Sequence, residues 1–125
     1  MARILIVDDD PNNRLLLRTV LAHAGHEVLE AATGGAGAQT ALAERPDVVV
    51  VDLSLPDMSG VDLIKKLRAG EETRDALIAL YTATRISPVI EELTELYGID
   101  GVIPKPADPR QIMAAFDALL ARRRG

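Results

Sequence analysis

Residues 47–60 read DVVVVDLSLPDMSG, and the run of consecutive valines in this stretch decides the fold class. Valine is β-branched and favours strands, and a strand that is apolar on both faces is typical of the centre of a parallel sheet. The run ends on Asp52 and continues into a loop containing Pro56 and Gly60. Aspartate is also a common turn former and helix cap, so the rest of the chain must decide what this carboxylate does.

The composition is typical of one globular domain. Of 125 residues, 48% are hydrophobic, 26% are charged and 2% are aromatic, so the core must be aliphatic. The absence of cysteine excludes disulfides, thiolate metal sites and cysteine nucleophiles. With only His23 and His26, a histidine-rich metal site and a histidine-dependent triad are both disfavoured. We expect a single domain over residues 1–125.

Charge and hydropathy favour a cytoplasmic protein without direct nucleic-acid or membrane contacts. The net charge of −5 disfavours non-specific binding to nucleic acid. The arginines at 122–124 are interpreted as the solvated end of a helix, because basic residues favour helix C-termini. No apolar stretch approaches the ~20 residues of a membrane span, and the N-terminal MARILIVDDD turns acidic where a signal peptide would stay apolar.

Short β-branched runs alternate along the chain with longer segments of helical period. Asp10 followed by Pro11 is typical of a helix start, and Gly25 of a helix end. The segment 27–31 is of mixed polarity, which favours an edge strand. Other helix limits are indicated by Gly70, by Ser87 with Pro88, by Gly98 and by Asp108. The predicted strands are 4–7, 27–31, 47–51, 76–81 and 101–103, and the predicted helices are 11–24, 35–45, 61–69, 87–96 and 108–123.

The alternation predicts an α/β fold with a doubly wound parallel sheet and helices on both faces, because right-handed crossovers place them there. A closed barrel of eight strands would need about twice this length. The apolar stripes predict which helix residues face the sheet: Leu15, Leu16, Val20 and Leu21 in the first helix, and Ile112, Met113, Phe116, Leu119 and Leu120 in the last.

Polar residues follow the predicted strands where the working site of such a sheet lies, at the carboxyl ends. Asp8, Asp9 and Asp10 follow the first strand, and Asp52 follows the third; Thr82 and Lys105 follow the fourth and fifth. Each has an ordinary explanation when taken singly: a helix cap for Asp10, a solvated loop for Asp8 and Asp9, a strand end for Thr82 and a surface charge for Lys105. Their convergence on one edge is less easily explained in that way.

The predicted cluster has a definite chemistry. Carboxylates brought together repel one another unless a cation compensates, and an all-oxygen site suits Mg²⁺. With such an ion and Lys105 in place, Asp52 could act as a nucleophile toward a phosphoryl donor, a reaction that needs positioning and charge neutralisation above all.

Four motifs resemble the receiver domain of two-component response regulators, chemotaxis regulators included, over essentially the whole chain. They are VDD at 7–9, DLSLPDMSG at 52–60, TA at 82–83 and KP at 105–106. The resemblance implies a flavodoxin-like sheet of five strands in the order 2-1-3-4-5 with five helices. It also implies a cis peptide bond between the lysine and proline of the last motif, which proline permits at modest cost.

The resemblance assigns a role to each residue of the cluster. Asp52 would be the phospho-acceptor, and Asp8 and Asp9 the acidic metal pocket, with Asp9 preferred as the direct ligand. The backbone carbonyl of Ser54 would complete the Mg²⁺ ligands from the protein. Thr82 would be the switch hydroxyl, and Lys105 would contact the phosphate. Separately, Asp57 and Gly60 are expected to shape the loop and start the third helix, and Thr84 to tune hydrolysis.

Two positions depart from the family pattern. The family usually carries Tyr or Phe three residues before the lysine, where this chain has Val102, and an aromatic after Lys-Pro, where it has Ala107. In the family the aromatic turns inward as the switch hydroxyl moves toward the phosphate. The usual readout is therefore in question, although no residue of the phosphorylation chemistry is missing.

The leading hypothesis is a stand-alone phospho-accepting domain of a phosphorelay. Its donor would be a histidine kinase or histidine phosphotransfer protein, and its output a contact with an unknown downstream protein, as a monomer or a phosphorylation-dependent dimer. Catalysis is expected only of its own phosphorylation and dephosphorylation. The alternatives are a binding module that uses the receiver shape without phosphorylation, and the receiver part of a longer regulator or hybrid kinase. A small hydrolase or flavin protein of similar fold is disfavoured.

Overall fold

The computed structural model describes residues 1–83 and 88–124, and at 123 and 124 the backbone alone. Strands and helices alternate throughout, as the sequence predicts. The strands are β1 (Arg3–Val7), β2 (Glu27–Ala31), β3 (Val48–Val51), β4 (Leu77–Thr82) and β5 (Gly101–Pro104). The helices are α1 (Pro11–His23), α2 (Gly34–Glu44), α3 (Gly60–Ala69), α4 (Pro88–Tyr97) and α5 (Pro109–Arg124).

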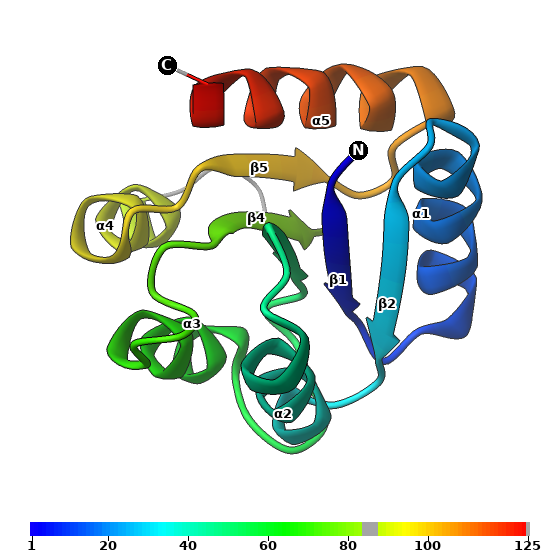
Figure 1. Ribbon diagram of the computed structural model, residues 1–125. Coiled ribbons are helices and arrows are strands. Elements are labelled where there is room, and N and C mark those ends of the chain that lie inside the picture. The colour runs from blue at the N-terminus through cyan, green and yellow to red at the C-terminus, as the bar shows by residue number, and fades with distance from the viewer. Residues whose placement is uncertain (84–87, 125) are drawn as a thin grey trace.

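The strands form one parallel sheet in the order β2-β1-β3-β4-β5. Helices α1 and α5 cover one face, and α2, α3 and α4 cover the other (Figure 1). The predicted doubly wound architecture and strand order are confirmed, and β2 lies at an edge as its mixed polarity indicated. No helix in the described part of the chain is long and apolar enough to cross a membrane.

The valine strand divides the core between the two faces. Val48 and Val50 pack with α1 and α5, whereas Val49 and Val51 pack with α2, α3 and α4, and all four are buried. A strand with a helical layer on each side has no solvated face. This is the physical reason for a run without polar alternation, and it makes β3 a rigid support for the residue that follows it.

Local signals in the sequence set the ends of α1. The Asp10 side chain accepts a hydrogen bond from the backbone N–H of Asn12 at 2.8 Å, and Pro11 takes the first turn. Gly25, just past the helix, has φ +90°, a conformation that glycine adopts without strain. A glycine with positive φ also follows α4, where Gly98 has φ +68°. Ser87, predicted to cap α4, lies outside the described residues.

The predicted apolar stripes are wrong at one position in each terminal helix. Leu15 is 50% exposed, and Leu17 is buried in its place beside Val20 and Leu21. Met113 is 41% exposed, although Ile112, Phe116 and Leu119 of the same helix are buried. Several rotations of a leucine-rich helix satisfy the 3.6-residue period. The packing of α1 and α5 on one another and on the sheet selects among them.

Candidate functional site

The carboxyl ends of four strands bring the predicted residues to one edge of the sheet. The ladder continues one residue past the strands, because Asp52 N donates to Val7 O at 3.1 Å and Lys105 N donates to Thr82 O at 2.9 Å. Asp8 N likewise donates to Ala31 O at 3.1 Å. The backbones of Asp8, Asp52 and Lys105 are therefore fixed by the sheet itself.

Lys105 joins two buried carboxylates. Its Nζ lies 3.1 Å from Oδ2 of Asp8 and 3.1 Å from Oδ2 of Asp52. Asp8 is 1% exposed and Asp52 is 7% exposed. Asp8 has further partners, since its Oδ1 accepts from the backbone N–H of Asp10 at 2.9 Å and its Oδ2 accepts from Nδ2 of Asn13 at 3.2 Å. These contacts occupy most of the positions at which the Asp8 carboxylate can accept a hydrogen bond. The Asp52 carboxylate has fewer partners and can accept more.

A third carboxylate completes an acidic cluster. One oxygen each from Asp8, Asp9 and Asp52 lies within 4.8 Å of the other two. Asp9 is exposed, so the cluster opens to solvent on its side. A single lysine cannot neutralise three carboxylates, and oxygen ligands alone suit a hard divalent cation such as Mg²⁺. The donor set therefore fits the predicted metal.

The environment of Lys105 keeps it charged. Burial of the ammonium lowers the pKa of Lys105, but the hydrogen bonds and charges of Asp8 and Asp52 outweigh that effect, and the pKa lies above its usual value. A permanently charged ammonium between two carboxylates stabilises the cluster and presents a cation where an incoming anion would meet Asp52.

Backbone N–H groups of the loop after β3 fix the Asp52 side chain and the path of the loop. Ser54 N donates to Oδ1 of Asp52 at 3.1 Å, and Gly60 N donates to Leu53 O at 2.9 Å. A Cβ on Gly60 would lie 2.5 Å from the carbonyl oxygen of Asp52 and 2.6 Å from Cα of Leu53. Only glycine allows the start of α3 to approach β3 so closely.

The prediction for Asp57 and Gly60 is right in part. Gly60 begins α3, but Asp57 does not cap that helix, because the cap is Ser59, whose Oγ accepts from Asp62 N at 3.1 Å. The Asp57 carboxylate instead accepts from the backbone N–H groups of Gly34 and Gly35 at 2.8 and 2.9 Å. Asp57 therefore ties the loop to the N-terminus of α2, where a negative charge is favourable.

The structure brings Asp8, Asp9, Asp52 and Lys105 together, and it places Thr82 and Ser54 at the same edge. Thr82 is 3% exposed at the end of β4, opposite Pro104 in the sheet register. Ser54 is exposed on the loop, where an isolated bridge pairs it with Ser59. The Lys105–Pro106 peptide bond is cis, as expected. Thr84 lies outside the described residues.

The two positions without an aromatic lie on opposite faces of the sheet. Val102, half-buried, pairs with Leu80 and packs on the side of α2, α3 and α4. Ala107 is buried on the side of α1 and α5. A valine or alanine packs here as core, and neither has a ring that could turn inward.

Sequence reasoning missed three residues that contact this site. Asn13 donates to Asp8, and Nη1 of Arg14 donates to the Asp8 carbonyl at 2.8 Å. Both lie in the first turn of α1, which the cap at Asp10 already places beside β1, so their positions could have been inferred. The third is Tyr81, whose ring centroid lies 5.1 Å from Nζ of Lys105. No motif marks Tyr81, and strand alternation alone only directs it to the face opposite that of Leu80.

Tyr81 is buried beside Lys105, and burial raises the pKa of its hydroxyl. The charge of Lys105 and the backbone of Ala107 lower this pKa and the charge of Asp8 raises it, so that the pKa lies above its usual value.

The fold and the acidic cluster agree with the comparison to known proteins. The family model of the response regulator receiver domain matches residues 4–117, and the chain belongs to this family. It is 34% identical to the protein PilH of Pseudomonas aeruginosa over 97% of this chain and 99% of that protein. It is 36% identical to the DNA-binding transcriptional regulator RpaA of Synechocystis over 98% of this chain and 50% of that protein.

Solved structures show the same arrangement. The chemotaxis response regulator CheY4 of Vibrio cholerae superposes with a TM-score of 0.88 at 28% identity, covering 95% of this chain and 98% of CheY4. A CheY-like receiver domain from Methanospirillum hungatei superposes with a TM-score of 0.89 at 29% identity, covering 99% and 97% of the two chains. The chain thus spans nearly all of PilH and about half of the transcriptional regulators it resembles.

Proposed function

We propose that this receiver domain accepts a phosphoryl group on Asp52 from the phosphohistidine of a histidine kinase or a histidine phosphotransfer protein. The observation that carries the proposal is the position of the Asp52 carboxylate, 3.1 Å from a lysine ammonium and within 4.8 Å of two further carboxylates. Such an arrangement supplies a nucleophile, a fixed cation and the ligands for a divalent ion at one point.

In the proposed reaction, one carboxylate oxygen of Asp52 attacks phosphorus. A P–O bond forms as the P–N bond breaks, and the electron pair of the broken bond stays on the histidine ring nitrogen. The Ser54 N–H, which donates to Oδ1 of Asp52, fixes the orientation of the carboxylate. Lys105 and the Thr82 hydroxyl would each hold one oxygen of the transferred group.

Asp9, Asp52 and the backbone carbonyl of Ser54 are the proposed protein ligands of Mg²⁺, with Asp8 beside them. Asp9 is preferred over Asp8 as a direct ligand because Asp8 already accepts from Lys105, Asp10 and Asn13. The bound ion would neutralise negative charge on the transferring phosphoryl group. Catalysis is confined, in this proposal, to the domain's own phosphorylation and dephosphorylation.

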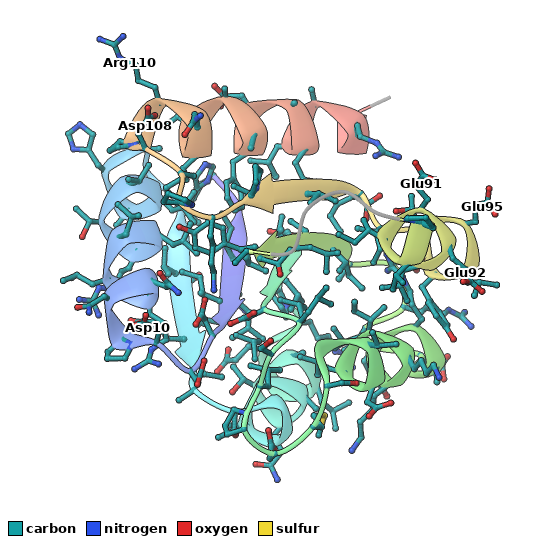
Figure 2. All side chains as sticks on the ribbon, turned by 180° about the vertical axis from the view of Figure 1, so that it is seen from behind. Asp10, Glu91, Glu92, Glu95, Asp108 and Arg110 are labelled. Atoms are coloured by element: carbon teal, nitrogen blue, oxygen red, sulfur yellow. The ribbon has the colours of Figure 1, made fainter. Side chains whose placement is uncertain are left out.

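The proposed output is a protein–protein contact in the cytoplasm, by a monomer or a phosphorylation-dependent dimer, on the face formed by α4, β5 and α5. Glu91, Glu92 and Glu95 project from α4 into solvent (Figure 2), and no ion pair involves them within the described residues. Val89 and Leu96 of the same helix, 61% and 63% exposed, lie on another side of α4, in a groove shared with Val61 and Lys65 of α3. A partner with basic side chains would complement the acidic residues of α4.

The proposal is tested with beryllofluoride, which mimics an aspartyl phosphate, and by labelling from a phosphorylated histidine kinase. Wild-type protein should bind beryllofluoride only with Mg²⁺ present, and should incorporate acid-labile phosphate. Asp52→Asn should lose both, whereas Asp62→Asn, an exposed carboxylate on α3, should retain both. Because tryptophan is absent, NMR and mobility-shift gels are the suitable readouts.

The same experiment distinguishes a phospho-accepting domain from a binding module that uses the receiver fold without phosphorylation. The loss of a ring at Val102 favours a binding module that does not respond to phosphorylation. A wild-type protein that ignores beryllofluoride and Mg²⁺ would support that candidate. Phosphate labelling that persists in Asp52→Asn would show that another residue is the acceptor.

A further inference from the structure

The Tyr81 ring lies against the lysine of the proposed site, on the side away from solvent. Its centroid is 5.1 Å from Nζ of Lys105, and the residue is 2% exposed. Tyr81 precedes Thr82 on β4, so its side chain points to the opposite face and packs with α1 and α5. Lys105 follows the neighbouring strand β5, which pairs with β4 in register.

The contact is of the kind that attracts an ammonium to the face of an aromatic ring, an attraction that grows when water is excluded. Lys105 is 17% exposed in its side chain, so much of its hydration has been lost. The ring carries no formal charge and accepts none of the hydrogen bonds that the ammonium makes to Asp8 and Asp52. It therefore adds attraction to the ammonium while those two contacts stay in place.

The chain has few other rings that could take this role. Its aromatic residues are Tyr81, Tyr97 and Phe116. Tyr97 ends α4, where Nε of Arg68 donates to its carbonyl, and Phe116 lies on α5 in the core. Among the described residues, Tyr81 is the aromatic with a cation over its ring.

We propose that Tyr81 is a positioning residue, whose ring holds the ammonium of Lys105 between Asp8 and Asp52 so that it meets the phosphoryl group as that group arrives. The proposal rests on the assignment of Lys105 as the phosphate contact. It also gives the site an aromatic on the α1 and α5 face, in a chain with valine at 102 and alanine at 107.

The positioning itself can be measured without phosphorylation. In the NMR spectrum of the wild type, the side-chain methylene protons of Lys105 should be shifted by the ring current of Tyr81. Tyr81→Phe keeps the ring and should keep the shift, whereas Tyr81→Leu should return these resonances to ordinary lysine positions. Phe116→Leu, which removes the other fully buried ring of the same core cluster, should leave them unchanged. Lysine resonances unaltered in Tyr81→Leu would overturn the proposal.

The consequence for the reaction is measured with acetyl phosphate and Mg²⁺, a donor that needs no partner protein. Tyr81→Leu should slow phosphorylation by about 2- to 30-fold, the range of a cation–ring interaction at a partly to fully desolvated site. Tyr81→Phe should stay close to the wild type, and Phe116→Leu should also, even if both leucine variants lose stability.

A double-mutant cycle decides whether Tyr81 acts through the lysine. In a Lys105→Ala background, Tyr81→Leu should have no further effect on the rate, because the group that it positions is gone. A purely structural role predicts the same slowing in both backgrounds, and that result would overturn the proposal. If wild-type protein is not labelled at all, the proposed function fails, and the lysine resonances still decide the positioning role.

Discussion

The ammonium of Lys105 lies 3.1 Å from Oδ2 of Asp52, although 53 positions separate the two residues in the chain. Each residue sits one step beyond a strand, and the two strands, β3 and β5, are separated only by β4. The contact therefore depends on the register of two strand pairs. It joins the proposed acceptor to the proposed phosphate contact.

Removal of Lys105 should destabilise the protein in the absence of Mg²⁺. In Lys105→Ala, the buried carboxylates of Asp8 and Asp52 lose a charged donor, at a cost of about 1–3 kcal/mol in the free energy of unfolding. Added Mg²⁺ should restore part of this loss, because it supplies the missing positive charge. Urea denaturation with and without Mg²⁺ measures both effects, with Lys65→Ala on the surface of α3 as the control.

Lys105→Ala should also separate the phosphorylation of Asp52 from the conformational response to it. Lys105→Ala should still accept some phosphate on Asp52, since the nucleophile and the acidic cluster remain. It should not show the conformational response of the wild type, which NMR would report as unchanged amide shifts in α4 and β5 after phosphorylation. A response equal to that of the wild type would contradict the role given to this lysine.

Mg²⁺ should stabilise the folded protein, because an ion that binds only the folded state adds RT ln(1 + [Mg²⁺]/Kd) to its stability. Asp9→Asn should lose most of this stabilisation. The neighbouring Asp10→Asn should keep it, since Asp10 serves as the α1 cap and asparagine also caps helices well. Thermal melts of the three proteins over a Mg²⁺ titration make the comparison. Equal stabilisation of Asp9→Asn and wild type would exclude Asp9 as a ligand.

Asp57 should contribute to stability in a pH-dependent way. Hydrogen bonds from the backbone N–H groups of Gly35 and Gly34 lower its pKa, so the carboxylate binds the proton less readily in the folded than in the unfolded chain. Its contribution is then complete above the unfolded pKa of about 3.9, and is lost as the pH falls through the lower folded pKa.

The difference in melting temperature between wild type and Asp57→Ala tests this sign. The difference should be constant near neutral pH and should shrink below a pH of about 4. Asp62→Ala is the comparison, because Asp62 lies in the first turn of α3 and does not bond to the N–H groups of Gly34 and Gly35. A difference that grows on acidification would contradict the anchoring role of Asp57.

Gly60→Ala should strongly perturb the loop, because its Cβ would lie 2.5 Å from the Asp52 carbonyl oxygen, which is backbone and cannot swing aside. The expected loss is about 1–3 kcal/mol in the free energy of unfolding, together with slower phosphorylation as Asp52 is displaced. Gly101→Ala is the control, since its Cβ would meet only a side-chain methyl of Leu119, at 3.3 Å, away from this loop. Urea denaturation and acetyl phosphate labelling measure the two effects.

Several features of the fold could be predicted because their causes are local. The valine run of β3, the cap at Asp10 and the glycine after α1 act within a few residues, and each is found where the sequence places it. The rule that parallel strands end at one edge then brings Asp8, Asp52 and Lys105 together. The rotation of α1 and the true role of Asp57 could not be predicted, because each depends on an element distant in the chain.

The sequence by itself determined the order of strands and helices, the family and the carboxylates and lysine of the site, since these follow from local periodicity and from motifs at strand ends. Only the tertiary structure decided that Leu17 rather than Leu15 is buried, that Asp57 holds α2, and that Tyr81 lies against Lys105. These contacts join separate elements across the sheet and its loops. Packing and strand register fix them, and no pattern within one element contains that information.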